Sequence, residues 1–152
     1  PDDFKGMVKA ILEIEAPLSE EFLLSRIIQS FDRKRVTDSV RNEFKVKMRG
    51  CQRYGIIRRN GFLYLEDSQN IRLRVPGDIA RPIGYIAPEE LAAGMFEILK
   101  QNGSIEKKDL YRTLLGQCGV HRLGKEIEKI LDKALHTLED SVIRNGEQLL
   151  LK

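Results

Sequence analysis

The sequence repeats itself at a spacing of 87 residues, and this repeat limits the fold more than any other feature. Shifted by that amount, apolar positions align through three helical patterns: Ile11-Leu12 with Ile98-Leu99, Leu18 with Ile105, Leu23 with Leu110, Ile27-Ile28 with Leu114-Leu115, Arg35-Val36 with Arg122-Leu123, and Val40 with Ile127. After a two-residue slip, Asn60-Gly61 aligns with Asn145-Gly146. Agreement at so many candidate core positions predicts two copies of one fold rather than one larger core.

Three helical patterns open the first copy. The first ends at Ala16-Pro17, because the residue before proline avoids the α region, and its apolar residues at helical spacing are Phe4, Met7, Val8, Ile11 and Ile14. Ser19 is the predicted N-cap of the second helix, and the expected buried face of that helix is Leu23, Leu24, Ile27, Ile28 and Phe31. A third, long helix follows, with Thr37 or Asp38 as its N-cap. Its buried stripe repeats every fourth residue as Val36, Val40, Phe44 and Met48.

Each copy closes with an Asn-Gly pair between two β-favouring runs. Asn60-Gly61 separates residues 56–59 from residues 62–65, and Asn145-Gly146 separates residues 142–144 from residues 149–151. A two-residue type I′ turn needs positive φ at both central residues, which Asn and Gly adopt readily. Both segments are therefore predicted β-hairpins.

The second copy begins with Pro88, at or near the first turn of a helix. Asn102-Gly103 is expected to end that helix, Ser104 to start the next, and Gly119 to turn the chain where the first copy has Asp32. These patterns predict a mainly α protein with small antiparallel β wings, organised as tandem winged-helix (helix-turn-helix-like) domains at residues 1–66 and 88–152. The apolar residues of the linker, residues 67–87, are expected to pack along both domains and to form a strand at Ile71–Val75.

Positive charge gathers in the first copy. Residues 31–59 contain 10 Lys and Arg against 3 Asp and Glu, a net charge of +7. Residues 1–75 contain 15 against 11, net +4, whereas residues 76–152 contain 11 against 12, net −1. Such local asymmetry is typical of a surface that binds a polyanion, although a run of charge is also compatible with a solvated helix face.

The basic residues fall in three groups. Four of them repeat every fourth residue, one residue after the buried stripe of the third helix and therefore about 100° round the helix axis. We call these four, Arg41, Lys45, Arg49 and Arg53, the cationic row. Others precede that helix or lie at the tip of the first hairpin. The predicted nucleic-acid-binding residues are Arg33, Lys34, Arg35, Arg41, Lys45, Arg49, Arg53, Arg58 and Arg59.

The sequence lacks the motifs of the common catalytic sites. It has no phosphate-binding Gly-rich loop and no nucleophile elbow, and the acid pairs Glu20-Glu21 and Glu89-Glu90 are typical of helix N-termini. Cys51 and Cys118 are expected to be buried thiols, and no metal site, cofactor or small-molecule substrate is indicated. No apolar run approaches the roughly 18–20 residues of a membrane span, and a start at Pro1 without a signal sequence indicates a cytoplasmic fragment of a longer chain.

Two segments resemble a known family. They are residues 14–27 (IEAPLSEEFLLSRI), followed by Phe31, Arg33 and Arg35, and residues 60–65 (NGFLYL), followed by Arg74-Val75-Pro76 and Pro88–Leu91 (PEEL). Together they resemble a C-terminal domain of unknown function in large bacterial superfamily-one DNA helicase-like proteins, some of which carry a restriction-endonuclease-like domain. The family tends to have Gly where this chain has Asp32. The resemblance implies an auxiliary role beside a nucleic-acid motor and no catalytic residues.

The sequence therefore favours a non-catalytic DNA-binding accessory module within a larger helicase- or nuclease-like protein. The alternative is a protein–protein interaction module that docks onto its parent motor or onto a partner, because an acidic protein surface would fit the basic row equally well and a fold does not fix a function. Salt-sensitive binding to arbitrary duplex DNA separates the two.

Overall fold

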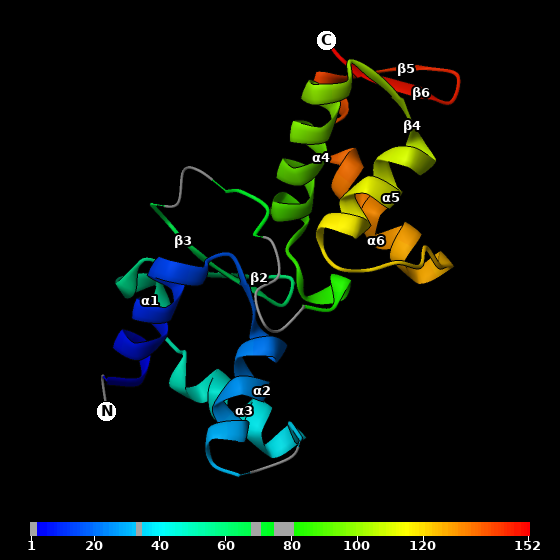
Figure 1. Cartoon of the computed structure of the whole chain (residues 1–152). Coiled ribbons are helices and arrows are strands. Elements are labelled where there is room, and N and C mark those ends of the chain that lie inside the picture. Colours follow the sequence, from blue (N-terminus) through cyan, green and yellow to red (C-terminus); the bar gives the residue numbers. More distant parts are fainter. Residues whose placement is uncertain (1–2, 33–34, 68–70, 75–80) are drawn as a thin grey trace. The chain divides into compact units, whose positions relative to one another are not determined.

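The computed structural model describes residues 3–32, 35–67, 71–74 and 81–152 (Figure 1). The chain divides into two compact units, Pro1–Asn70 and Ile71–Lys152. Within the described residues, the helices are all too short or too polar to cross a membrane.

Both units contain three α-helices and a three-stranded antiparallel sheet. The elements of the first unit are α1 (Asp3–Glu15), β1 (Leu18–Ser19), α2 (Glu20–Ser30), α3 (Asp38–Lys47), the 3-10 helix η1 (Cys51–Tyr54), β2 (Ile56–Arg59) and β3 (Phe62–Leu65). Those of the second are η2 (Ile83–Tyr85), α4 (Pro88–Asn102), β4 (Ser104–Glu106), α5 (Lys107–Gln117), α6 (Lys125–His136), η3 (Glu139–Ser141), β5 (Val142–Asn145) and β6 (Gln148–Leu151). The strand orders are β1-β3-β2 and β4-β6-β5.

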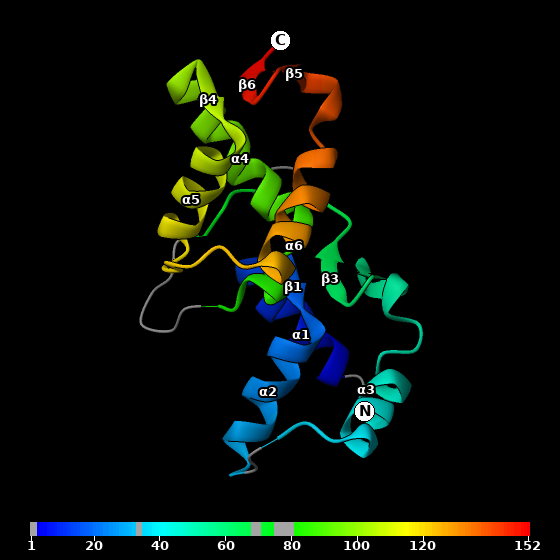
Figure 2. The same ribbon diagram turned by 90° about the vertical axis from the view of Figure 1, so that its right-hand side faces the viewer.

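The two units follow the repeat that the sequence predicts. α2 and α5 begin 87 residues apart, at Glu20 and Lys107, and α3 and α6 do the same, at Asp38 and Lys125. Asp32 and Gly119, which are also 87 apart, both have positive φ, 59° and 76°. An aspartate tolerates this left-handed geometry because its short polar side chain forms local hydrogen bonds. The same turn is therefore formed by Asp32 in the first unit and by Gly119 in the second. In the second unit, both views show α4, α5 and α6 side by side (Figures 1 and 2).

Capping side chains fix where the helices of the first unit begin. Ser19 is extended, at φ −65° and ψ 131°, and its hydroxyl accepts a hydrogen bond from the backbone N–H of Phe22. Thr37 caps α3 in the same way, by accepting from the N–H of Val40. Both satisfy a backbone donor that the helix itself leaves without a partner.

The prediction of one long third helix is wrong. α3 ends at Lys47, and Gly50 has φ 75°, a left-handed conformation that interrupts the helical hydrogen-bond ladder. Of the cationic row, Arg41 and Lys45 lie on α3, Arg49 lies in the turn after it, and Arg53 lies on η1. Met48 and Cys51 are nevertheless both buried, so the apolar stripe continues into the core beyond the end of the helix.

The prediction that Phe31 is buried is also wrong, since its side chain is 72% exposed. α2 ends at Ser30, and Phe31 is the C-cap residue with φ −105° and ψ 21°. It has therefore left the helical path that carries Leu24 and Ile28 into the core.

Two expectations for the second copy need correction. Ser104 begins strand β4, which pairs with β6, so α5 starts only at Lys107. In the second hairpin Asn145 pairs with Gln148, which leaves Gly146 and Glu147 as the turn. Gly146 has φ 64° at the first turn position, as a type II′ turn requires. The two hairpins are consequently offset by one residue from the helical repeat, and not by two.

The expected linker belongs in part to the second unit. The described residues Ile71–Arg74 form no strand, and Val75 lies outside the described residues. Leu73 packs against the core of the second unit, in which Ile83 and Ile86 are buried. We call residues 71–74 and 81–86 together the strap.

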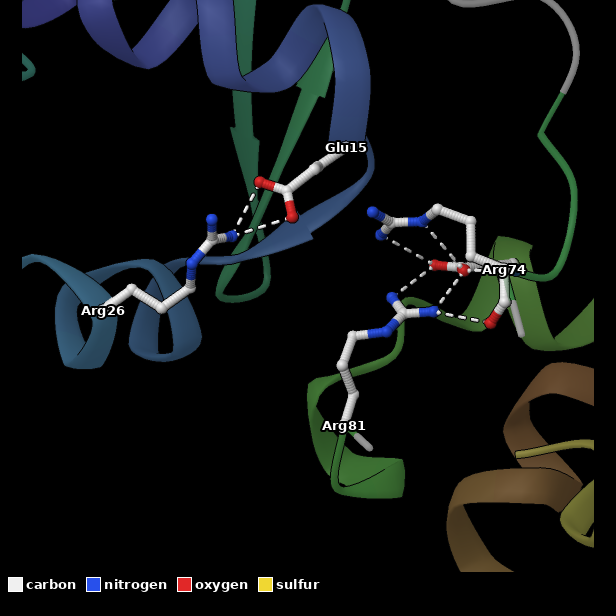
Figure 3. Close-up of polar contacts among 5 residues, drawn as sticks. Glu15, Arg26, Arg74 and Arg81 are labelled. Carbon is white, nitrogen blue, oxygen red and sulfur yellow. Dashed lines mark hydrogen bonds and ion pairs between the residues drawn. The ribbon is translucent and has the colours of Figure 1, made fainter. Parts of the chain in front are cut away.

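A buried ion cluster fastens the strap to α4. Glu90 is fully buried, and it accepts hydrogen bonds from the backbone N–H of Arg74 at 2.9 Å and from Nη1 of Arg81 at 2.9 Å. Figure 3 shows both guanidinium groups pointing at this one carboxylate. Burial alone would raise the pKa of Glu90, but the hydrogen bonds from Arg81 and Arg74 hold it below its usual range.

Gly94 on α4 lies directly against Leu73 of the strap. A Cβ at this position would lie 2.7 Å from Leu114 Cδ1 and 2.8 Å from Leu73 Cδ2. We expect Gly94→Ala to destabilise the second unit by about 1–3 kcal/mol, because the added methyl overfills a packed contact. Gly116→Ala on α5 is the control, since no atom lies within 4 Å of its Cβ position. Hydrogen exchange of the α4 amides measures both, and equal protection in the two variants would contradict the tight contact.

Candidate nucleic-acid interface

Two of the predicted binding residues form ion pairs within the first unit. Nη2 of Arg41 lies 2.7 Å from Glu21 Oε1, and its Nη1 lies 2.9 Å from Asp38 Oδ1. Nε of Arg58 lies 2.6 Å from Glu20 Oε1, and the same guanidinium lies 5.7 Å from the centre of the Phe44 ring. Hydrogen bonds to these carboxylates raise the pKa of both arginines above the usual value. Arg41 and Arg58 therefore join α3 and the hairpin to the first turn of α2.

Arg59 lies at the hairpin tip, as the sequence predicts. It is the last residue of β2 and pairs with Phe62 across the Asn60-Gly61 turn. Its guanidinium carbon lies 4.4 Å from the centre of the Tyr64 ring, a cation–π distance. The ring covers one face of the flat guanidinium, so the contact orients Arg59.

Three cations of the predicted row are exposed and form no ion pair with any residue that the structure describes. They are Lys45 on α3, Arg49 in the following turn and Arg53 on η1. Arg35, just before α3, is exposed as well. The predicted residues Arg33 and Lys34 lie outside the described residues.

The same positions carry opposite or neutral groups in the second unit. At a shift of 87 residues, Arg41, Lys45 and Arg49 correspond to Glu128, Asp132 and His136. The sign of the charge is also reversed in the first turn of the second helix of each unit, because Glu20-Glu21 of α2 correspond to Lys107-Lys108 of α5. The two units therefore carry inverted charge patterns on one scaffold.

The second unit uses its inverted charges internally. Lys107 Nζ lies 3.1 Å from Asp132 Oδ1, and the hydroxyl of the buried Tyr111 donates to the same oxygen at 2.6 Å. Burial opposes ionisation of Asp132, but these two donors hold its pKa below the usual range. Burial and the bond to Asp132 raise the pKa of Tyr111. An acid therefore occupies the position that corresponds to Lys45.

The charge difference between the two units is local. With the boundary between Asn70 and Ile71, the first unit contains 13 Lys and Arg against 11 Asp and Glu, net +2, and the second contains 13 against 12, net +1. The difference between the halves of the sequence arises largely because Arg72 and Arg74 belong to the second unit. The basic character of residues 31–59 is instead balanced by acids elsewhere in the first unit.

Sequence reasoning misses the part that Glu20 and Glu21 play in this surface. Their pattern indicates acids that suit the start of a helix, and both do lie in the first turn of α2. Their partners Arg58 and Arg41 lie 38 and 20 residues further along the chain. Only the folding of the hairpin and α3 back onto α2 brings them together.

Among the described residues, no group of three His, Cys, Asp or Glu side chains lies close enough to hold a metal ion. Cys51 and Cys118 are free and buried, as predicted, and burial raises the pKa of both thiols. Comparison of the chain with family models, with curated proteins and with solved structures found no match.

Proposed function

We propose that this chain is a non-catalytic DNA-binding module made of two winged-helix domains, and that it serves a larger cytoplasmic helicase- or nuclease-like protein. The element order in each unit, helix, strand, helix, helix and hairpin, supports the winged-helix assignment, as does the strand order β1-β3-β2. The resemblance of residues 14–27 and 60–65 to the helicase-associated family supports the context.

One observation carries the DNA-binding proposal. Lys45, Arg49 and Arg53 are exposed on consecutive elements, and no described residue neutralises them. Arg59 at the hairpin tip adds a further oriented cation. Lysine and arginine contacts to phosphate provide affinity without sequence information, so we expect binding to duplex DNA of arbitrary sequence.

The test is a titration of a fluorescent duplex with the full chain at several salt concentrations. Phosphate contacts release counterions, so the logarithm of the binding constant should fall linearly with the logarithm of the salt concentration. Absence of salt-dependent binding would instead favour the docking module, in which the basic surface binds an acidic protein.

Glu20 and Glu21 should limit the affinity for DNA. Their carboxylates occupy the guanidinium groups of Arg58 and Arg41, which a phosphate would otherwise contact. We expect the double variant Glu20→Gln, Glu21→Gln to bind duplex DNA on the order of tenfold more tightly. The slope of the logarithm of the binding constant against the logarithm of the salt concentration should become steeper by up to about 1.8, or about 0.9 for each arginine released.

The matched control changes two exposed acids of the same unit that form no ion pair among the described residues, Glu13→Gln and Glu66→Gln. Both double variants alter the net charge by the same amount, so the control removes the general effect of charge. Equal gains in affinity for the two variants would show that the ion pairs of Glu20 and Glu21 have no special role.

A further inference from the structure

The first unit contains an apolar groove that remains open. It has a volume of about 470 Å³ and lies among α1, α2 and α3. Phe4, Ile27 and Phe31 line it, and the ion pair between Glu43 and Lys47 lies on its rim. Phe31 is 72% exposed, which is unusual for a large aromatic side chain that borders a core.

The repeat identifies the same groove in the second unit. At a shift of 87 residues, Phe4 corresponds to Leu91, Ile27 to Leu114 and Phe31 to Cys118. All three of these counterparts are buried, with Leu91 and Leu114 at 0% exposure and Cys118 at 2%. The second unit therefore covers the surface that the first leaves open.

The strap provides that cover. Leu73 packs close to Gly94 on α4 and Leu114 on α5. A Cβ on Gly94 would lie 2.8 Å from Leu73 Cδ2 and 2.7 Å from Leu114 Cδ1. At the other side of the groove, η2 contacts α6, and the Cβ position of Gly84 lies 3.9 Å from Ile130 Cδ1. Ile130 corresponds to Glu43 on the rim in the first unit. Residues 71–74 thus contact this surface on α4, and residues 81–86 contact it on α6.

Charge also holds the strap on α4. Arg74 and Arg81 of the strap bind the buried Glu90 on α4. The same register places another acid, Asp3, at the corresponding position of the first unit. Where the second unit has Gly94 beneath Leu73, the first has Met7 with a side chain 43% exposed. The first unit consequently repeats the apolar wall, and within the described residues its groove remains open.

We infer that the groove of the first unit is a docking site for a peptide segment of a partner protein with the chemistry of the strap. That segment places an aliphatic residue beside an arginine, followed by a short turn with two further aliphatic residues. The aliphatic side chains cover Ile27 and Phe31, and the arginine corresponds to Arg74, which binds Glu90, the counterpart of Asp3 in the sequence repeat. This inference does not depend on DNA binding.

The probe is a synthetic peptide of residues 71–87, added to the ¹⁵N-labelled full chain and followed by amide chemical shifts. A tethered segment has an effective concentration on the order of millimolar, so the free peptide is titrated to about 1 mM. The expected result is saturable shift changes in residues 24–31 of α2 and the following cap, and in residues 40–47 of α3. Phe31→Ser should weaken binding at least tenfold, and Phe31→Leu should retain it.

Ile14→Ser is the control, because Ile14 is 82% exposed and does not line the groove. A peptide in which Leu73 is replaced by aspartate should bind at least tenfold more weakly. Four results would overturn the inference: no shift changes at 1 mM, changes confined to α4 and α6, equal binding by Phe31→Ser and the parent, or groove signals that depend on protein concentration without peptide. The last would assign the groove to a second copy of the chain.

Discussion

Replacement of Lys45, Arg49 and Arg53 by glutamate should lower the affinity for duplex DNA by on the order of 100-fold or more at about 0.15 M salt. The three side chains are exposed and form no ion pair among the described residues, so the variant should fold. Removal of each phosphate contact should also flatten the salt dependence by roughly 0.9, or about 2.7 for all three. Fluorescence anisotropy across a salt series gives both quantities. Arg41 is left unchanged because its replacement would leave Glu21 and Asp38 without their partner.

A charge-matched variant of the second unit separates placement from total charge. Lys125, Lys133 and Lys152 are exposed, and their replacement by glutamate changes the net charge by the same amount. Long-range attraction follows the total charge, whereas direct binding of phosphate follows position. We therefore expect a much smaller decrease in affinity for this control. Equal decreases in affinity for the two variants would indicate that the cationic surface is only a solvated helix face.

Glu90→Gln should unfold the second unit much more readily while leaving the first unchanged. The substitution leaves two guanidinium groups beside a neutral amide, and breaking a buried ion pair costs about 3–5 kcal/mol. Arg74 is partly exposed and can recover some hydration, which favours the lower figure. A loss of about 3 kcal/mol corresponds to a roughly hundredfold increase in the opening equilibrium.

Hydrogen exchange is the right measurement for Glu90→Gln, because a chain of two units need not unfold in one step. Protection should fall in α4 and α5 and stay constant in α1 and α2. Glu97→Gln is the control, as Glu97 is an exposed acid of the same helix. Unchanged protection of α4 in Glu90→Gln would show that the ion cluster does not hold the strap.

The lowered pKa of Glu90 gives this contribution a definite pH dependence. A carboxylate with a depressed folded-state pKa stabilises the protein fully above the unfolded value, which is about 4.3 for glutamate. That contribution disappears as the pH falls from there through the folded pKa. The parent and Glu90→Gln should therefore approach each other in stability below about pH 4.

The local features of the fold could be predicted from the sequence because they depend on short-range chemistry. The apolar spacing, the cap at Ser19 and the Asn60-Gly61 turn each follow from a few neighbouring residues. The repeat can be recognised for the same reason, because apolar residues at matching spacings form the corresponding elements of the two units. The position of Arg59 at the hairpin tip follows directly from the turn.

Other features depend on contacts between distant residues or on a single backbone angle. Gly50 ends α3 early although the apolar stripe continues, because its φ of 75° breaks the helix without breaking the core. Leu73 and Ile83 appear in a stretch rich in proline and glycine, and only the groove on α4 and α6 makes them core residues. The pairing of Glu20 with Arg58 likewise requires the hairpin to fold back onto α2.

The most direct measurement of DNA binding by the first unit is amide chemical-shift mapping of the full chain with a short duplex. We predict that the changes lie between Asp38 and Arg59, on α3, the turn after it, η1 and the hairpin tip, and that they diminish as salt is added. The corresponding elements of the second unit, from Lys125 to Asn145, should be unaffected. Changes centred on those residues, or none at low salt, would contradict the proposal.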